Sequence, residues 1–385
     1  MTAQDRPQQL PQILAFLLPQ FHQIPENDAW WGEGFTEWTN VRKAKAQFPG
    51  HRQPRVPRGN RYYDLLDPET REWQAALARD HAIGGFCYYH YWFNGRRLLE
   101  RPVEAILRSG KPDFPFCLAW ANEPWTRTWD GGDRDVLMPQ EYGGRDEWEA
   151  HYRNLEIAFR DPRYIRADGR PVILIYRSAS IADIGGMLDC WRTLAVRSGF
   201  PGLHVVSMLT TFGPDARRDL FDAFAEFEPF CSRARLPLPI KVYEKAANVA
   251  CRQIWKWRGV GPYAPRSLDY RLLWNEIASR PLPANHYPGA FADWDNSPRK
   301  YLSSSLVFRN VSLETFRRGF ERLYAKAVAA DSRFIFFNAW NEWAEGTYLE
   351  PDEELGAGYL EAIRAVVQAA GAAPRSRTGR LQPST

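Results

Sequence analysis

This sequence of 385 residues has few cysteines, a small net charge and no apolar run long enough to cross a membrane. Its five cysteines include no Cys-x-x-Cys pair, so neither a disulfide framework nor a zinc site is indicated. The seven histidines show no metal-ligand spacing, and we expect no metal and no cofactor. A net charge of +4 on a chain of this length does not indicate a nucleic-acid partner.

Three common catalytic motifs are also missing from the sequence. There is no Gly-x-Gly-x-x-Gly after an apolar run, no phosphate-binding loop and no Gly-x-Ser-x-Gly elbow. Asp133-Arg134-Asp135 and Asp293-Trp294-Asp295 match the Asp-x-Asp pattern with which many nucleotide-sugar transferases hold a divalent ion. Matches of that length are frequent by chance, and no nucleotide-binding half precedes either of them.

The two ends of the chain differ from the rest. Residues 1–11 form a short extension, and the apolar run after it, Ile13–Leu18, is too short for a secretory signal and lacks a preceding basic region. Residues 371–385 are rich in Ala, Gly, Pro, Ser and Arg, which predicts a disordered tail. We therefore expect one domain at residues 12–370, without a transmembrane segment and in the cytoplasm.

Apolar runs of strand length alternate with amphipathic helical segments along this domain. The runs are apolar on consecutive residues, which is typical of strands buried on both faces. About eight such units in one continuous alternation predict an α/β protein that forms a single (β/α)8 TIM barrel. The predicted strands are Ile13–Leu18, Gly84–Tyr89, Phe114–Ala119, Val172–Tyr176, Leu203–Met208, Ala223–Phe227, Tyr287–Phe291 (the weakest) and Phe334–Ala339. The predicted helices are Pro68–His81, Pro102–Ser109, Arg145–Phe159, Asp183–Ser198, Asp269–Ser279, Ser312–Ala330 and Ala357–Ala370.

The segments that follow the predicted strands are much longer than those that precede them. Pro19–Asp67, His90–Arg101 and Trp120–Gly144 are rich in polar and aromatic residues, whereas Ala82-Ile83 is short and plain. In a barrel, the strand-to-helix loops build the functional site at the C-terminal face. Ser232–Ser267 is too long for a simple connection, and we expect an excursion that covers the mouth of the barrel.

Two glutamates, Glu342 and Glu345, follow the last predicted strand among Trp, Asn and Gly residues. Residues three apart in a strand point to opposite faces, so the two carboxylates converge only if the chain turns after the strand. Paired carboxylates among aromatic rings suit glycosidic-bond chemistry, in which one group donates a proton and another stays ionised. A pair of solvated loop glutamates is the plain alternative, against which the neighbouring tryptophans and glycine argue.

Residues suited to binding sugars recur at nearly every predicted strand end. A sugar is bound by stacking of its C–H faces on aromatic rings and by polar side chains that take its hydroxyls. Any one of these residues has a structural alternative, and the recurrence is what indicates a glycan site. The candidates for substrate contact are Gln20, His22, Glu37, Trp38, His90, Trp92, Asn122, Glu123, Trp125, Glu226, Glu228, Trp294, Asp295, Asn341 and Trp343. The rings expected to flank the glycan are Trp38, Trp92, Trp125 and Trp343.

One stretch, from Arg42 to Arg61, is locally basic. A solvated loop is the interpretation that composition favours, and a site for an anionic ligand is the alternative. Its other basic residues are Lys43, Lys45, Arg52, Arg55 and Arg58.

Four segments resemble the WbsX-like proteins, which are encoded with bacterial surface-polysaccharide genes and are often called glycosyltransferases. The segments are Phe16–His22, Gly34–Asn40, Gly85–Phe93 and Asn338–Thr347. That group is placed beside glycoside hydrolase family 99, the endo-α-mannosidases, to which the resemblance is narrower and covers Asn341–Thr347. The resemblance implies a (β/α)8 barrel that acts with retention and without a metal. It also implies that Glu342 helps to deprotonate the sugar 2-hydroxyl and that Glu345 is the general acid/base.

Of three functional hypotheses, the sequence favours the first, because paired glutamates can carry out that chemistry unaided. The first is a glycosidase or transglycosylase of bacterial surface polysaccharide or O-antigen metabolism. The second is a glycosyltransferase that uses an activated sugar donor in lipopolysaccharide biosynthesis, and the third is a glycan-binding barrel without catalysis. The partner in each case is an oligo- or polysaccharide, and a lipid-linked or anionic glycan is one of the alternatives.

Overall fold

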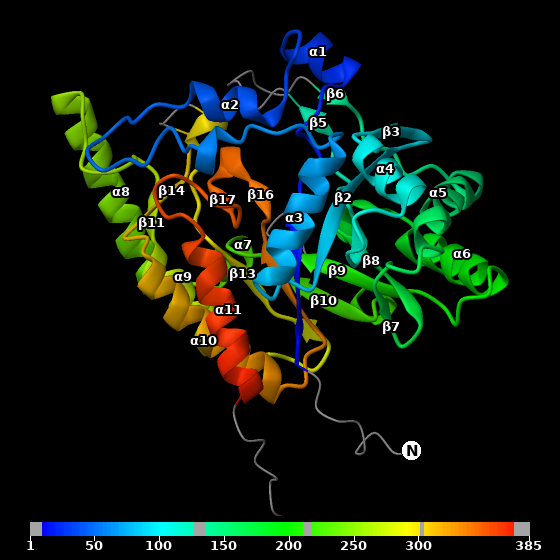
Figure 1. Ribbon diagram of the computed structural model, residues 1–385. Helices are drawn as coiled ribbons and strands as arrows, with labels where there is room; N and C mark the ends of the chain where they lie inside the picture. Colours follow the sequence, from blue (N-terminus) through cyan, green and yellow to red (C-terminus); the bar gives the residue numbers. More distant parts are fainter. Residues whose placement is uncertain (1–9, 127–135, 211–216, 301–303, 373–385) are drawn as a thin grey trace, which may run out of the picture.

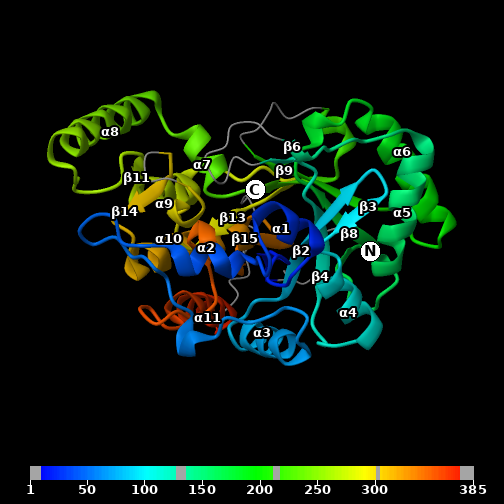
Figure 2. The same cartoon turned by 90° about the horizontal axis from the view of Figure 1, so that it is seen from above.

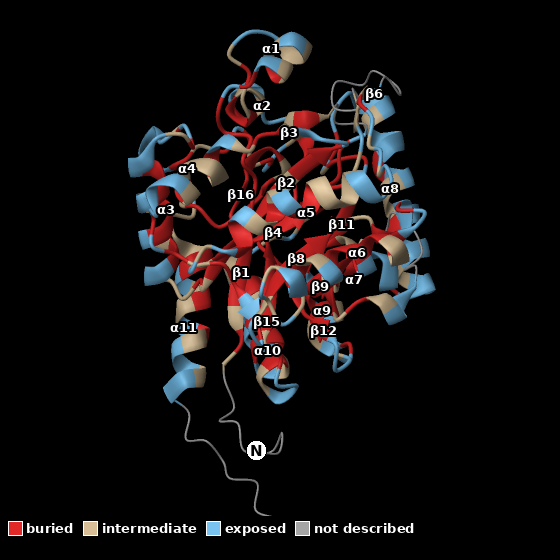
Figure 3. Ribbon diagram, turned by 90° about the vertical axis from the view of Figure 1, so that its right-hand side faces the viewer, coloured by how far each residue is buried: buried red, intermediate tan, exposed pale blue. Residues whose placement is uncertain are grey.

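The computed structural model describes residues 10–126, 136–210, 217–300 and 304–372. At its centre, parallel strands form a barrel whose residues are almost all buried (Figure 3). The order of strands around the barrel is β12-β10-β9-β8-β4-β2-β1-β15-β13. The predicted (β/α)8 barrel is confirmed. The strands are β1 (Gln12–Leu17), β2 (Gly85–Phe93), β4 (Phe116–Trp120), β8 (Arg170–Ile175), β9 (His204–Leu209), β10 (Ala223–Glu226), β12 (His286–Tyr287), β13 (Gly289–Phe291) and β15 (Phe334–Asn338).

The segments β12 and β13 are two parts of one strand, and together they close the barrel. β12 pairs with β10, and β13 pairs with β15. Pro288 separates them because it has no N–H to give to the ladder. Its carbonyl still accepts a hydrogen bond from the backbone N–H of Phe336 at 3.0 Å. Eight strands therefore enclose the core, and the weakest of the predicted strands, Tyr287–Phe291, is one of them.

Helices wrap the outside of the barrel (Figure 2). Polar caps fix where several of them begin: the side chain of Asp67 accepts from Glu69 N, and that of Ser312 accepts from Thr315 N. In the connection from β9 to β10, the described residues hold a 3-10 turn, Arg218–Leu220, and no α-helix. The outer helices are α3 (Pro68–Asp80), α4 (Arg101–Ser109), α5 (Arg145–Phe159), α6 (Ile184–Arg197), α9 (Tyr270–Ser279), α10 (Leu313–Ala329) and α11 (Gly358–Ala372).

Aromatic rings from several strands meet around Phe16 in the core. The Phe16 ring stacks on Tyr89 with 5.5 Å between centroids and on Phe336 with 5.7 Å, and it meets Phe227 edge-on at 5.6 Å. Truncating a buried phenylalanine of this kind to alanine costs about 3–5 kcal/mol. Side chains therefore fill the interior of the barrel, and a binding site can form only among the loops at its C-terminal end.

These loops lie at the upper end of the molecule in Figure 1, around α1 and α2. They carry most of the short elements, and the bend after β15 brings β16 and β17 together in an antiparallel pair. The short elements are α1 (Pro25–Trp31), α2 (Glu37–Lys43), η1 (Arg58–Asn60), β3 (Arg96–Leu98), β5 (Trp125–Thr126), β6 (Val136–Met138), β7 (Arg166–Ala167), η3 (Ser178–Ser180), η5 (Ser297–Arg299), β14 (Val307–Arg309), β16 (Asn341–Glu342), η6 (Trp343–Glu345) and β17 (Thr347–Tyr348).

The excursion after β10 holds α7 (Phe230–Arg235), α8 (Leu238–Arg258) and β11 (Ser267–Asp269). Figure 2 shows α8 at one side of the barrel rather than over its axis. The excursion was expected to cover the mouth of the barrel, and for α8 this expectation is wrong, because the helix lies beside the barrel. Residues on either side of α8, such as Arg233 and Arg266, do reach the cavity at the mouth.

None of the helices in the described ranges combines the length and the hydropathy of a membrane-spanning segment. Helix α11 continues to Ala372, two residues into the predicted tail. The rest of that predicted tail, residues 373–385, and residues 1–9 of the predicted extension lie outside the described residues.

Candidate active site

A cavity of about 550 Å³ opens at the C-terminal end of the barrel. Its volume falls within the range of about 300–1,000 Å³ that is usual for small-molecule sites. Its walls come from the ends of several barrel strands and from the loops that follow them. Six of the predicted site residues line it, namely Gln20, Glu123, Trp125, Trp294, Glu342 and Glu345.

A tight turn brings Glu342 and Glu345 to the same side of the chain. Glu342 ends β16, and residues 343–345 form one 3-10 turn in which side chains three positions apart eclipse each other. Gly346 closes the turn with φ +68°, and a Cβ there would lie 2.8 Å from the backbone nitrogen of Asp295. The predicted bend after the last strand is present, and Gly346 is the residue that permits it.

The side chain of Arg299 joins the two glutamates and a third acid. Its Nη1 donates to Glu345 at 2.6 Å, its Nη2 to Glu342 at 3.0 Å, and its Nε to Glu37 at 2.7 Å. Arg299 comes from η5 and Glu37 begins α2, so loops after three different strands meet here. Arg299 is not among the site residues predicted from the sequence. The only local signal is that it follows closely on a strand end rich in Asp and Asn.

The balance of charge in this cluster controls its protonation. Three carboxylates face one guanidinium, so full ionisation would leave a surplus of negative charge in a buried place. Burial raises the pKa of Glu342 to about 8; Arg299 opposes this rise, and the charge of Glu345 adds to it. Burial lowers the pKa of Arg299, but Glu37, Glu345 and Glu342 together raise it well above its ordinary value. Arg299 therefore stays charged, and Glu342 is largely protonated at neutral pH.

The glutamate pair differs in access to the cavity. The side chain of Glu345 is 26% exposed, whereas that of Glu342 is 9% exposed. Both glutamates line the cavity, and Glu345 is the more accessible of the two from it.

Buried polar contacts hold the motif from behind. The Asn341 side chain accepts from Leu18 N at 2.7 Å and donates to Leu18 O at 3.0 Å, which ties the motif to the end of β1. The Trp343 indole N–H donates to the carboxylate of Glu350 at 2.7 Å, and the Trp340 indole N–H donates to it at 3.0 Å. Burial raises the pKa of Glu350 to about 7. Glu350 is a second buried acid near the site that was not predicted from the sequence.

The rings that line the cavity are mostly different from those expected. Of the four predicted rings, Trp125 lines it, while Trp38, Trp92 and Trp343 lie outside its lining. Trp38 packs against Trp343 with 5.5 Å between centroids, and Trp92 stacks on His151 at 4.7 Å, so all three are engaged with other side chains. The remaining aromatic lining is Trp31, Tyr89, Tyr91, Tyr176, Phe227, Phe230 and Trp294.

Eight other predicted residues lie outside the cavity lining, and each has a partner elsewhere. His22 Nδ1 contacts Pro19 O at 2.8 Å, and His90 Nε2 contacts His151 Nε2 at 3.0 Å. The remaining six are Asn122, Glu226, Glu228, Asp295, Asn341 and Glu37. Two of these, Asn341 and Glu37, still touch the glutamate cluster or the chain that carries it, as described above.

The acids among these residues form internal ion pairs. Arg280 is buried with Glu226 and Glu228, and its Nε donates to Glu226 at 2.9 Å. Asp295 contacts His51 at 2.9 Å; burial opposes its ionisation, but the hydrogen bond from His51 and the nearby cation of Arg55 hold its pKa at about 2. These groups fix the loops that surround the cavity.

Asn122 anchors the loop that carries Glu123. Its side chain accepts from Arg177 N at 2.8 Å and donates to Arg177 O at 2.9 Å. The Arg177 guanidinium also pairs with Glu123 at the cavity wall. Asn122 thus joins the ends of β4 and β8.

The basic stretch from Arg42 to Arg61 divides into two kinds of residue. Arg55 is buried and donates to Asp293 at 2.7 Å, and Arg52 pairs with Glu354 at 2.7 Å. Lys43, Lys45 and Arg58 are exposed. None of them lines the cavity, and the anionic-ligand alternative for this stretch gains no support.

The fold and the site together define the class as a (β/α)8 barrel protein, with a carboxylate cluster in a cavity at the C-terminal end of its strands. The sequence profile of the family described as "Glycosyltransferase WbsX" matches residues 13–363, and the chain belongs to that family. In Xanthomonas campestris pv. campestris, two strains each have an "Uncharacterized protein WxcX" that is 39% identical over 385 residues and covers 98% of this chain. The chain spans 52% of the length of these relatives.

Solved structures show the same fold. A "Glycoside hydrolase-like protein" superposes with a TM-score of 0.55 at 15% identity, covering 93% of this chain and 94% of that one. The GH99 endo-α-mannosidase from Bacteroides thetaiotaomicron, in complex with bis-tris-propane, gives 0.52 at 15% identity, covering 94% and 99%. The predicted resemblance to the WbsX-like proteins is confirmed, together with the likeness in fold to the family 99 barrel.

Proposed function

We propose that this chain cleaves or transfers glycosidic bonds with retention of configuration. Glu345 acts as the general acid/base, and Glu342 takes the proton of the sugar 2-hydroxyl. The observation that carries the proposal is the cluster of Glu342, Glu345 and Arg299 at the wall of a cavity lined by aromatic rings. Paired carboxylates with different environments are the requirement of this chemistry.

The steps follow from the positions of the two acids. Glu345, the more exposed of the pair, gives its proton to the glycosidic oxygen as that bond breaks. Glu342 takes the 2-hydroxyl proton, and the 2-oxygen attacks the anomeric carbon as the leaving group departs. Water or an acceptor hydroxyl, deprotonated by Glu345, then opens the strained ring, and the proton held by Glu342 returns to the 2-oxygen. Two inversions give net retention.

Arg299 has a positioning role in this scheme. Its planar fork fixes both carboxylates at once, which a lysine ammonium does less well. Its charge also lowers the pKa of Glu342 from the still higher value that burial alone would impose, so that a fraction of Glu342 is ionised near neutral pH. Glu37 orients Arg299 from the far side through Nε.

The substrate we propose is a glycan of bacterial surface polysaccharide metabolism, and the cytoplasmic location stays a prediction. Transfer from an activated sugar donor is the second candidate function, which the name of the family favours. Release of a nucleotide or lipid phosphate during turnover would identify such a transferase. A protein that binds glycans and turns none over would instead be the non-catalytic barrel.

The first experiment is a screen of the wild-type chain against α-mannosides, lipid-linked oligosaccharides and sugar nucleotides. On any substrate found, Glu345→Gln should reduce turnover about 10²-fold or more, because the amide keeps the shape of the side chain and has no proton to transfer. Glu361→Gln on the exposed face of α11 is the matched control and should leave turnover unchanged. Near-normal turnover by a folded Glu345→Gln protein would refute the assignment.

A further inference from the structure

A second hollow, of about 620 Å³, adjoins the active-site cavity between α7, α8 and β11. Arg233, Arg266 and Leu306 line both hollows, so the two share a wall. We call the second hollow the cationic annexe, because its basic lining residues are Arg233, Lys241, Lys245, Arg252 and Arg266. A molecule that occupies the cavity next to Glu345 has the annexe beside it.

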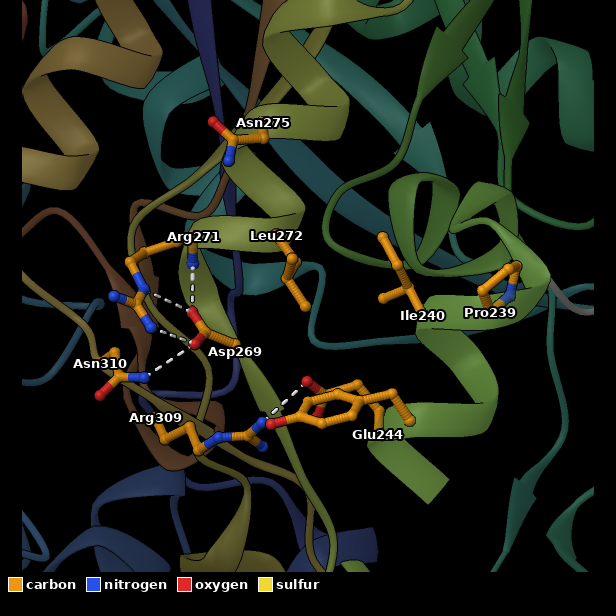
Figure 4. A pocket seen from close by; sticks show the side chains of 10 residues that line it. Pro239, Ile240, Glu244, Asp269, Arg271, Leu272, Asn275, Arg309 and Asn310 are labelled. Atoms are coloured by element: carbon orange, nitrogen blue, oxygen red, sulfur yellow. Dashed lines mark hydrogen bonds and ion pairs between the residues drawn. The ribbon is translucent and has the colours of Figure 1, made fainter. Parts of the chain in front are cut away.

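The positive charge of the annexe is not cancelled by its acidic neighbours. Among the described residues, Glu244 is the one acid that lines it, and both oxygens of Glu244 accept from Arg309 Nη2, at 2.7 and 2.8 Å. Figure 4 shows this pair beside Asp269, which is likewise bound to Arg271 and Asn310. The acids of this region are therefore neutralised by partners outside the annexe.

Two arginines of the annexe, Arg233 and Arg266, lie close enough for their charges to act on each other. The side chain of Arg233 makes no hydrogen bond or ion pair with any residue in the described ranges, and Arg266 donates from Nη1 to the carbonyl of Ser304 at 2.9 Å. Burial lowers the pKa of Arg233, and the charge of Arg266 lowers it further. Like charges brought together in this way repel each other until an anion separates them.

We propose that the annexe binds a phosphate or diphosphate group attached to the glycan that is processed in the active-site cavity. This inference rests on the proposed function. Arginine is suited to phosphate because its planar fork meets two oxygens at once. A single carboxylate of an acidic sugar needs one cation, whereas five basic side chains match the multiple charge of a diphosphate.

A diphosphate of this kind comes either from a nucleotide sugar or from a lipid carrier. The outward face of α8 bears on this choice because it exposes large apolar side chains beside the basic ones. The exposed fractions are 73% for Leu238, 58% for Val242 and 78% for Trp257. Apolar and basic side chains together are what a helix needs to rest on an anionic membrane surface, so both sources must be tested.

The primary test is the binding of inorganic pyrophosphate by titration calorimetry, which needs no turnover. The wild-type chain should bind it saturably, and Arg233→Gln should weaken the affinity about tenfold, the loss expected for one charge-assisted contact. Arg235→Gln is the matched control, since Arg235 is exposed on the same helix, as Arg233 is, but lies outside the annexe; the affinity of this variant should equal that of the wild type. Absence of saturable binding, or equal affinities in the two variants, would overturn the proposal.

Competition then distinguishes the two sources. Uridine diphosphate should displace pyrophosphate if the donor is a nucleotide sugar, and vesicles carrying a long-chain alkyl diphosphate should displace it if the carrier is a lipid. Failure of both to compete would also overturn the proposal. Because Glu345→Gln keeps the annexe intact, loss of turnover with normal pyrophosphate binding in that variant tests the catalytic assignment alone. Normal turnover without pyrophosphate binding would refute the annexe alone.

Discussion

The ionisation of Glu342 should set the pH dependence of turnover. Burial raises the pKa of this group to about 8, and a base must be ionised to take the 2-hydroxyl proton. With that pKa, about a tenth of the molecules carry ionised Glu342 at pH 7, about half at pH 8 and about nine-tenths at pH 9. The value of kcat/KM should therefore rise about fivefold from pH 7 to pH 8 and about tenfold from pH 7 to pH 9.

A substitution at Arg299 tests whether the rise of kcat/KM with pH, the rising limb of the pH profile, reports the ionisation of Glu342. The cation of Arg299 lowers the pKa of Glu342, so Arg299→Gln should move the rising limb above pH 8. Breaking a buried ionic network costs about 3–5 kcal/mol, and the melting temperature of the variant must be measured first to select a temperature at which it is folded.

The assay is kcat/KM between pH 5.5 and pH 9.5 at constant ionic strength, on the substrate that the screen identifies. The expected profile has a rising limb centred near pH 8 in the wild type. A falling limb centred there, with no rising limb, would make Glu342 the proton donor and reverse the roles of the two glutamates.

Two further predictions concern binding and stability. Trp125→Ala should weaken glycan binding by about 1–3 kcal/mol with little change in melting temperature, because this ring lines the cavity. Trp343→Ala should instead cost about 3–5 kcal/mol of folding stability, because this ring is buried. If Trp125→Ala and Trp343→Ala had similar effects on glycan affinity and on melting temperature, the assignment of one ring to binding and the other to stability would be wrong. The buried acids Glu342 and Glu350 have folded pKa values of about 8 and about 7 against an ordinary 4.5, so the stability that they contribute is present below pH 4.5 and lost as the pH rises towards 8. The free energy of unfolding in urea should fall between pH 5.5 and pH 8.5, and by less in Glu342→Gln; equal slopes for the two proteins would show that Glu342 does not titrate in this range.

The alternation of apolar runs and amphipathic helices was sufficient to predict the barrel. Each strand run is recognisable because it is buried on both faces, and each helix because its apolar residues recur on one side; both signals are local. The strand boundaries agree within a few residues, with β2 as the main exception, since it continues to Phe93 and carries Tyr91 to the cavity. The position of Glu342 and Glu345 after the last strand was readable for the same reason.

The direction of each loop side chain was decided by tertiary structure alone. Trp125 and Trp343 occur in similar aromatic surroundings in the sequence, yet the first lines the cavity and the second is buried against Tyr348 and Glu350. A loop has no periodicity that tells which face a ring presents, so recurrence at the strand ends indicated a glycan site without selecting its members.

The sequence by itself determined the barrel, its functional end and the pair of glutamates. The tertiary structure decided what surrounds that pair. Arg299 lies 43 residues before Glu342, and Glu37 lies 262 residues before Arg299, yet one guanidinium holds both acids. Ion pairs of this kind form between loops that only the closed barrel brings together. The pKa of Glu342 depends on that burial and on those charges, so it is a property of the folded molecule and not of the motif.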